Sequence, residues 1–175
     1  LGLKYDGSLK DLVIQTQAQW LRKDGKERWE VEALFEDKRE ELLPLFKQLG
    51  LLDERVPVQG HYNYVLVLGG LLTSVRNRIK FLIQLWDKGI RFDTVILLGG
   101  ERYLDPKKEL ELLASEKYAG MPLQTETDMM NHTYKHLIAS SSMNLVPFVT
   151  IDTPRQLLVG GGTRRPTTAD TFNEW

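Results

Sequence analysis

The amino-acid sequence predicts an α/β protein: a Rossmann-like open parallel sheet with helices on both faces, preceded by a helical N-terminal segment. From Tyr62 onward, short apolar runs alternate with longer stretches of helical periodicity, which is typical of parallel strands buried on both faces. Two of these runs end in a pair of glycines, as strands of such sheets do where a ligand binds. We therefore expect a helical prefix over residues 1–60, packed on an α/β domain over residues 61–175.

The helical prefix opens with a capping pattern. Ser8 followed by Asp11 resembles a capping box, and apolar residues then recur at helical spacing. Apolar residues recur in the same way from Glu27 to Leu49. Pro44 is expected to split this stretch as an early residue of a second short helix, because proline suits the first turn, and Gly50 is expected to end that helix.

Three apolar runs are predicted to be the strands of the sheet: residues 64–68, 94–98 and 147–151. Helical segments separate them, so the strands should be parallel neighbours joined by right-handed crossovers, with their carboxyl ends on one side. The first two runs are followed by Gly69-Gly70 and Gly99-Gly100, where we expect tight turns.

Four helices complete the predicted domain. The first covers residues 74–88, where the apolar residues share one side. The second opens with Asp105-Pro106, an N-cap followed by a proline at the first helical position, and runs to about Tyr118. The third covers residues 125–139. The fourth begins at Thr167 or Thr168 and continues to the end of the sequence.

Composition and charge narrow the function classes. With 175 residues, 42% hydrophobic and 27% charged, the chain is ordinary for a soluble globular protein of one domain with a small appendage. A net charge of −1 gives no general attraction to nucleic acid or to an anionic membrane. The absence of cysteine rules out disulfides and thiolate metal sites.

The ends of the chain bear on its location. No apolar run approaches the roughly 18 residues of a membrane span, and the first residues lack a signal-peptide pattern. A cytoplasmic protein is therefore expected. The sequence begins at Leu1 and stops at Trp175 inside an expected helix, so we also expect a fragment of a longer protein, truncated within its α/β domain.

Three glycine-rich segments are expected to meet at one edge of the sheet. Gly69-Gly70 and Gly99-Gly100 would let a ligand approach the backbone, and the helix starting near Ser74 offers free N–H groups to an anion. Neither pair matches the dinucleotide or P-loop patterns, and taken alone the pairs are better explained as tight turns without a ligand. The expected convergence of all three segments at one edge favours a ligand site. The third segment, residues 160–162, precedes further candidate ligand-binding residues: Arg164, Thr168, Asp170 and Thr171.

Metal binding is the weaker interpretation of another pattern. Asp128, His132 and His136 fall four residues apart on a predicted helix and so share one face, as metal ligands can. No H-E-x-x-H motif and no cysteine accompanies them. Surface side chains without a metal are therefore the preferred interpretation, and no metal is predicted.

A set of short motifs follows in order from about Tyr62. They are Leu68-Gly69-Gly70, Arg76 on the next helix, Leu98-Gly99-Gly100, Thr125-Glu126-Thr127, Leu145-Val146-Pro147, and Thr168 to Glu174. Together they resemble the bacterial YdcF/SanA/ElyC family. The family has serine where this chain has Leu98 and asparagine where it has Asp170, and the order of Asn173-Glu174 is reversed.

The resemblance implies a Rossmann-like domain with a polar pocket at the carboxyl ends of the strands. It also implies a role in envelope biogenesis and a ligand such as S-adenosylmethionine or another nucleotide.

Two functions from different classes follow. The first is a small-molecule-binding α/β protein, or an enzyme, whose ligand is nucleotide-like or anionic. Arg76 and Arg164 would supply positive charge, and Glu126 would have a polar or acid/base role unless it only caps its helix. The second is a non-catalytic interaction module whose helical prefix binds a partner.

Overall fold

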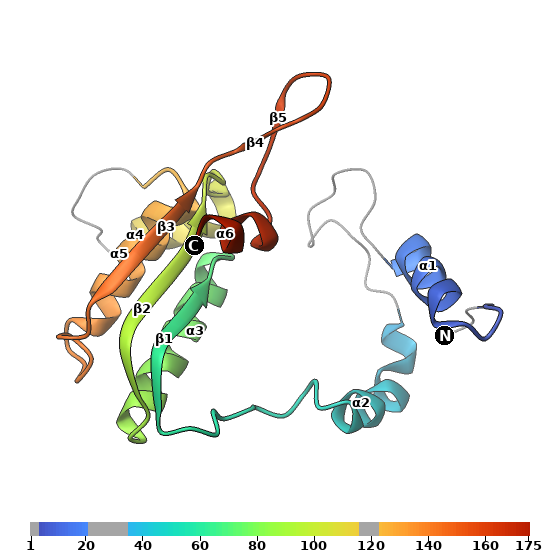
Figure 1. The fold of residues 1–175 in the computed structure, drawn as a ribbon, viewed down its shortest axis with the longest axis horizontal. Helices are drawn as coiled ribbons and strands as arrows, with labels where there is room; N and C mark the ends of the chain where they lie inside the picture. The colour runs from blue at the N-terminus through green and yellow to red at the C-terminus, as the bar shows by residue number, and fades with distance from the viewer. Residues whose placement is uncertain (1–3, 21–34, 116–122) are drawn as a thin grey trace. The chain divides into compact units, whose positions relative to one another are not determined.

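A computed structural model of the chain describes residues 4–20, 35–115 and 123–175. The chain divides into two compact units, Leu1–Glu54 and Arg55–Trp175. Figure 1 shows the elements of both units, and each unit is described by itself below.

The first unit contains α1 (Leu9–Trp20), the 3₁₀ turn η2 (Glu36–Lys38) and α2 (Arg39–Gln48). The predicted start of α1 is confirmed, because the Ser8 hydroxyl accepts the Asp11 N–H at 3.1 Å. Gly50 follows α2 with φ 68°, as a helix stop requires. None of the described residues of this unit is buried.

Pro44 lies inside α2, so the prediction that it splits this stretch as an early residue of a second helix was wrong. The helix starts five residues earlier, with Glu40 and Glu41 in its first turn. Carboxylates are favoured at that position by the helix dipole, and this signal outweighs the proline. The part of the predicted helical stretch over residues 27–34 lies outside the described residues.

The second unit is built on a parallel sheet of β1 (His61–Leu68), β2 (Arg91–Gly100) and β3 (Phe148–Thr153), in that spatial order. Val65 pairs with Val95, which pairs with Phe148. The predicted parallel pairing and neighbourhood of the three strands are confirmed. The fold is therefore mixed α/β with an open parallel sheet.

Gly99 and Gly100 belong to β2, so the prediction of a tight turn at this pair was wrong. They stay in the ladder because β3 continues alongside and pairs with them through Asp152 and Thr153. Glycine is needed there for close packing instead. A Cβ on Gly99 would lie 2.6 Å from the Thr127 hydroxyl of α5.

Three helical segments of this unit begin at their predicted caps, whereas the first helix begins two residues before its predicted start at Ser74. α3 spans Leu72–Asp87, and Asp105 caps the π-helical turn η3 (Pro106–Leu110), which continues as α4 (Glu111–Ser115). The expected continuation to Tyr118 lies outside the described residues. Thr125 and Thr167 cap α5 (Glu126–Ile138) and α6 (Thr168–Glu174), each with a complete capping box.

The glycines at the end of β2 define the two faces of the sheet. Successive residues of a strand point to opposite faces. Gly99 faces α5, whereas Gly100 faces Pro166, just before α6. α3 and α5 therefore lie together on one face, where the core forms around residues such as Val75, Val95 and Met130, and α6 lies on the other face.

A short hairpin connects β3 to α6. Its strands are β4 (Gln156–Leu157) and β5 (Thr163–Arg164), which pair antiparallel. Three consecutive glycines, residues 160–162, all have positive φ and bring the chain back from the tip of the loop into β5. The sequence analysis did not predict this hairpin, and Figure 1 shows it extending away from the sheet.

Candidate functional site

The carboxyl ends of β1 and β2 carry a group of charged side chains at the two glycine pairs. β1 ends at Leu68, and the ladder continues for one more bond, from Gly69 N–H to the Leu98 carbonyl at 2.9 Å. Gly70 then leads into α3. This is the sheet edge at which the sequence predicts a ligand.

Glu126, the second residue of the Thr125-Glu126-Thr127 motif, lies directly on Gly69. A Cβ on Gly69 would be 2.5 Å from Glu126 Oε2, so no larger residue fits without displacing the carboxylate. Glu126 is not the cap of α5. Thr125 and Asp128 form the capping box, which leaves the Glu126 carboxylate directed at the strand ends.

Arg102 joins Glu126 to a second glutamate, Glu109 of η3. Its Nε donates to Glu126 Oε1 at 3.2 Å, and its two terminal nitrogens donate to the two Glu109 oxygens at 2.7 and 2.9 Å. One of these nitrogens also donates to the Gly70 carbonyl at 3.1 Å. Glu109 is fully buried, while Arg102 and Glu126 are 16% and 14% exposed.

Glu109 also fills the N-terminus of α3. The Leu72 N–H donates to Glu109 Oε1 at 3.2 Å, and the Asp105 N–H donates to Oε2 at 2.9 Å. The N-cap residue of α3, Leu71, has no side-chain capping bond. A carboxylate of the protein itself therefore occupies the position at which the sequence predicts an anionic ligand.

The cluster holds two carboxylates and one guanidinium, a net charge of −1 when all are ionised. Burial raises the pKa of Glu126 above its usual value, although Arg102 opposes this shift. Burial alone would lower the pKa of Arg102, but its bonds to Glu109 and the charge of Glu126 raise it overall. Burying such charges costs free energy even when they are paired, so a cluster here is a candidate for function.

Arg78 brings a positive charge to the same edge. Its guanidinium donates to the carbonyls of Leu68, at 2.7 Å, and of Gly69. A Cβ on Gly70 would lie 3.0 Å from Arg78 Nη1. The predicted arginine of this helix, Arg76, is half-buried on α3. Arg78, two residues further along, donates to the end of β1.

Thr127 and Asp152 connect the ends of α5 and β3. The Thr127 hydroxyl donates to Asp152 Oδ1 at 2.7 Å, next to Gly99. Asp152 is exposed, so its carboxylate adds an accessible acceptor to the same edge of the sheet.

The C-terminal candidates bind one another. Arg164 donates to both Asp170 oxygens, at 2.7 and 3.1 Å, and Asp170 also accepts the N–H and the hydroxyl of Thr167. These bonds, that to Arg164 above all, lower the pKa of Asp170. The Thr171 hydroxyl donates to the Thr168 carbonyl at 2.8 Å. Four candidate ligand-binding residues thus make bonds that stabilise the start of α6 and its connection to β5.

The possible metal ligands have other contacts. Asp128 Oδ2 accepts the N–H groups of Gln124 and Thr125, at 3.0 and 2.9 Å. The rings of His132 and His136 stack with centroids 6.1 Å apart. Across the described residues, no group of three or more acidic, histidine or cysteine side chains could hold a metal ion.

Sequence analysis missed Arg102, Glu109 and Arg78 as members of the site. Arg102 follows Gly100 by two residues, and this spacing was the available signal. Glu109 had none, because it reads as an ordinary charged residue within a capped helix.

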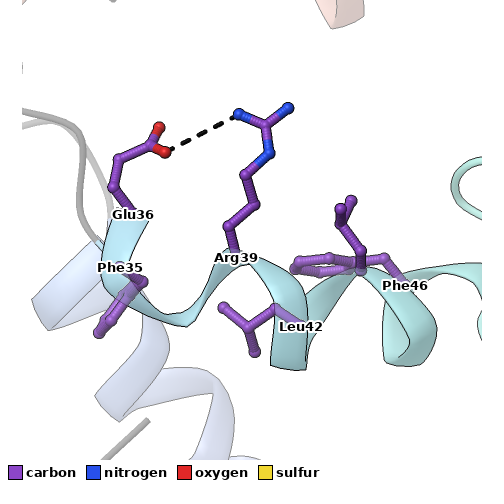
Figure 2. A pocket seen from close by; sticks show the side chains of 6 residues that line it. Phe35, Glu36, Arg39, Leu42 and Phe46 are labelled. Atoms are coloured by element: carbon purple, nitrogen blue, oxygen red, sulfur yellow. Dashed lines mark ion pairs between the residues drawn. The ribbon is translucent and has the colours of Figure 1, made fainter.

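An apolar depression lies on α2 and the turn that precedes it. It has a volume of about 320 Å³ and is lined by Phe35, Glu36, Arg39, Leu42, Leu43 and Phe46. Figure 2 shows Glu36 and Arg39 directed at one another, with their closest nitrogen and oxygen 3.8 Å apart.

Within the described ranges, no helix is both long enough and apolar enough to cross a membrane.

Comparisons of this chain with models of known protein families, with curated proteins and with solved structures found no match.

Proposed function

We propose that this chain is a Rossmann-like domain that binds a nucleotide-like small molecule at the carboxyl ends of β1 and β2. The observation that carries the proposal is the pair of opposite charges over consecutive glycines. The Glu126 carboxylate lies on Gly69 and the Arg78 guanidinium lies on Gly70. A carboxylate suits ribose hydroxyls, and a guanidinium suits a phosphate or carboxylate, as in nucleotide recognition.

The topology supports the Rossmann-like part of this proposal. Three parallel strands follow one another in one direction, with α3 and α5 on the same face. The chain then moves to the opposite face at Pro166 and α6. Doubly wound sheets change face in this way when their strand order reverses, and ligands bind at that reversal. The motifs shared with the YdcF/SanA/ElyC family point to the same edge and to S-adenosylmethionine among candidate ligands.

The charges make a purely anionic ligand the less favoured one. Glu109 already fills the N-terminus of α3, and Asp170 neutralises Arg164. Hydroxyl or amino groups on the ligand would instead meet the acceptors Glu126 and Asp152. If the bound molecule reacts, Glu126 is the residue suited to move a proton, because its raised pKa brings it nearer to neutral pH.

Calorimetric titration with S-adenosylmethionine, ATP and adenosine tests this proposal. At least one of the three should bind, and Glu126→Gln should weaken that binding by about tenfold or more, as expected for a lost hydrogen bond to a charged group. Glu111→Gln, on the exposed surface of α4, is the matched control and should bind like the wild type. Binding of none of the three, or equal binding by the Glu126 variant, would contradict the proposal.

The apolar surface of the first unit favours interaction with a partner as a second function. Leu43, Leu45, Phe46 and Leu49 are all exposed along and just after α2, beside the depression in Figure 2. A helix that buries none of its apolar residues gains its stability from docking rather than from its own core. Leu43→Asp should then abolish capture of the partner without changing the thermal stability of the second unit. A partner that binds residues 55–175 alone would contradict this function.

A further inference from the structure

The tip of the β4–β5 hairpin is a run of three exposed aliphatic residues. Leu157 and Val159 are 86% and 108% exposed, and Leu158 between them is also exposed. Loop tips are usually polar, and isolated apolar residues at the surface need no explanation. A contiguous aliphatic run at the end of a projecting hairpin is different, because it presents its whole apolar surface to whatever the hairpin meets.

The hairpin holds this tip in a defined shape. Gln156 pairs with Arg164 and Leu157 with Thr163, and the Leu158 N–H donates to the Gly162 carbonyl at 3.1 Å. The Arg155 guanidinium crosses the stalk to the Thr163 hydroxyl at 2.9 Å. The glycines of the returning arm carry no side chains, so the exposed aliphatic residues supply the apolar surface of the loop.

The charge of the hairpin differs from that of the chain. Residues 153–169 contain three arginines and no acidic residue, whereas the whole chain has a net charge of −1. Two carboxylates contact the base of the hairpin: Glu101 accepts the Arg155 N–H, and Asp170 pairs with Arg164. In the sequence, Arg155 precedes the aliphatic run and Arg164 and Arg165 follow it, so the two arms of the hairpin both carry arginine.

We propose that the β4–β5 hairpin docks on the surface of an anionic lipid bilayer, with Leu157, Leu158 and Val159 entering the boundary between headgroups and acyl chains. Aliphatic side chains that penetrate this boundary, with arginines at headgroup level, are the combination by which peripheral proteins bind anionic membranes. A protein partner fits less well. The tip has no aromatic residue, whereas Trp and Tyr are prominent among the residues that dominate protein interfaces.

This docking is independent of the proposed ligand site. It needs only the hairpin tip, whereas ligand binding needs Glu126 and Arg78. Failure of one leaves the other standing, because the two are tested with different variants and different probes.

The absence of native cysteine gives a direct test. Val159→Cys carries an environment-sensitive fluorophore at the tip. Leu145→Cys carries it at a residue that is 90% exposed and lies just before β3, at the amino end of that strand. With vesicles of phosphatidylcholine containing about 30% phosphatidylserine, the label at 159 should shift to the blue and the label at 145 should not. A similar response from both labels, or none from the label at 159, would overturn the proposal.

Binding strength provides the second measurement. The affinity for the same vesicles, measured by co-sedimentation, should weaken by roughly tenfold to a hundredfold in Val159→Asp. This variant removes a valine that would enter the bilayer and adds a charge. Leu145→Asp should bind like the wild type. Binding to phosphatidylserine vesicles should exceed binding to pure phosphatidylcholine and should fall with added salt. Equal binding to both lipids, or unchanged binding by Val159→Asp, would refute the docking.

Discussion

Replacing Gly69 by alanine tests the contact on which the candidate site depends. The new Cβ would lie 2.5 Å from Glu126 Oε2 and 2.6 Å from its carboxyl carbon, so the carboxylate must move away from Arg102. Gly69 does not have a positive φ, so alanine adds no backbone strain there. The nearest atoms that the new Cβ meets all belong to the Glu126 carboxyl group.

Two effects set the magnitude. Loss of the charged hydrogen bond to Arg102 costs about 1.5 kcal/mol, the low end of the usual range, because burial already disfavours the ionised Glu126. Alanine in place of glycine restricts the unfolded chain and stabilises by about 0.5 kcal/mol. Gly69→Ala should therefore destabilise the second unit by about 1 kcal/mol, as measured by urea unfolding followed by circular dichroism.

A double-mutant cycle isolates the contact. In the Glu126→Ala background the obstruction is gone, so Gly69→Ala should stabilise by about 0.5 kcal/mol, which gives a coupling energy of about 1.5 kcal/mol. Gly60→Ala is the control, because Gly60 has nothing within 4 Å of the added Cβ and should stabilise in both backgrounds. If Gly69→Ala were equally harmful with and without Glu126, the contact would not be the cause and the reasoning would fail.

Three further predictions concern the buried and paired carboxylates. Glu109→Ala removes the fully buried partner of Arg102 and should destabilise the protein by about 3–5 kcal/mol in urea unfolding. Glu111→Ala, on the exposed side of α4, should change stability by less than about 0.5 kcal/mol. Equal effects of the two variants would contradict the buried pair. The pKa of Glu126 in the folded state is raised above 4.5, so its contribution to stability is greatest below pH 4.5 and falls as pH rises through the raised pKa. Glu126→Gln should flatten that decline in unfolding curves measured over a series of pH values. An unchanged pH profile would exclude the shift. The pKa of Asp170 is lowered below 3.8, so its contribution to stability is present above pH 3.8 and is lost as pH falls through the lowered pKa. Asp170→Asn should therefore reduce the acid sensitivity of hydrogen exchange in α6. Identical exchange in both proteins would refute this.

Local signals made much of the fold predictable from sequence. Thr125 and Thr167 cap their helices, and Asp105 caps its turn, through side-chain bonds to residues only two or three places away. The three apolar runs became neighbouring parallel strands because continuous apolar sequence is stable only when both faces are covered. Such signals lie within a few residues of the feature that they predict.

Features that depend on distant residues were not predictable in the same way. Gly99 stays in β2 because β3, about 50 residues further along the chain, pairs with it. Arg102 meets Glu109 and Glu126 only after the chain folds back, and the hairpin strands are too short, at 2 residues each, to have a periodicity. Arg164 and Asp170, whose opposite charges lie six residues apart, bind each other, and the ligand-binding roles expected of them stay predictions.

Amide chemical shifts of ¹⁵N-labelled protein test the central claim most directly. On titration with S-adenosylmethionine, ATP or adenosine, the account predicts that the largest changes occur at the carboxyl edge of the sheet, in Gly69, Gly70, Arg102 and Thr127, and that Glu126→Gln weakens them. Changes confined to the amino edge near His61 and Asp93, or to α2, or none with any of the three compounds, would contradict it.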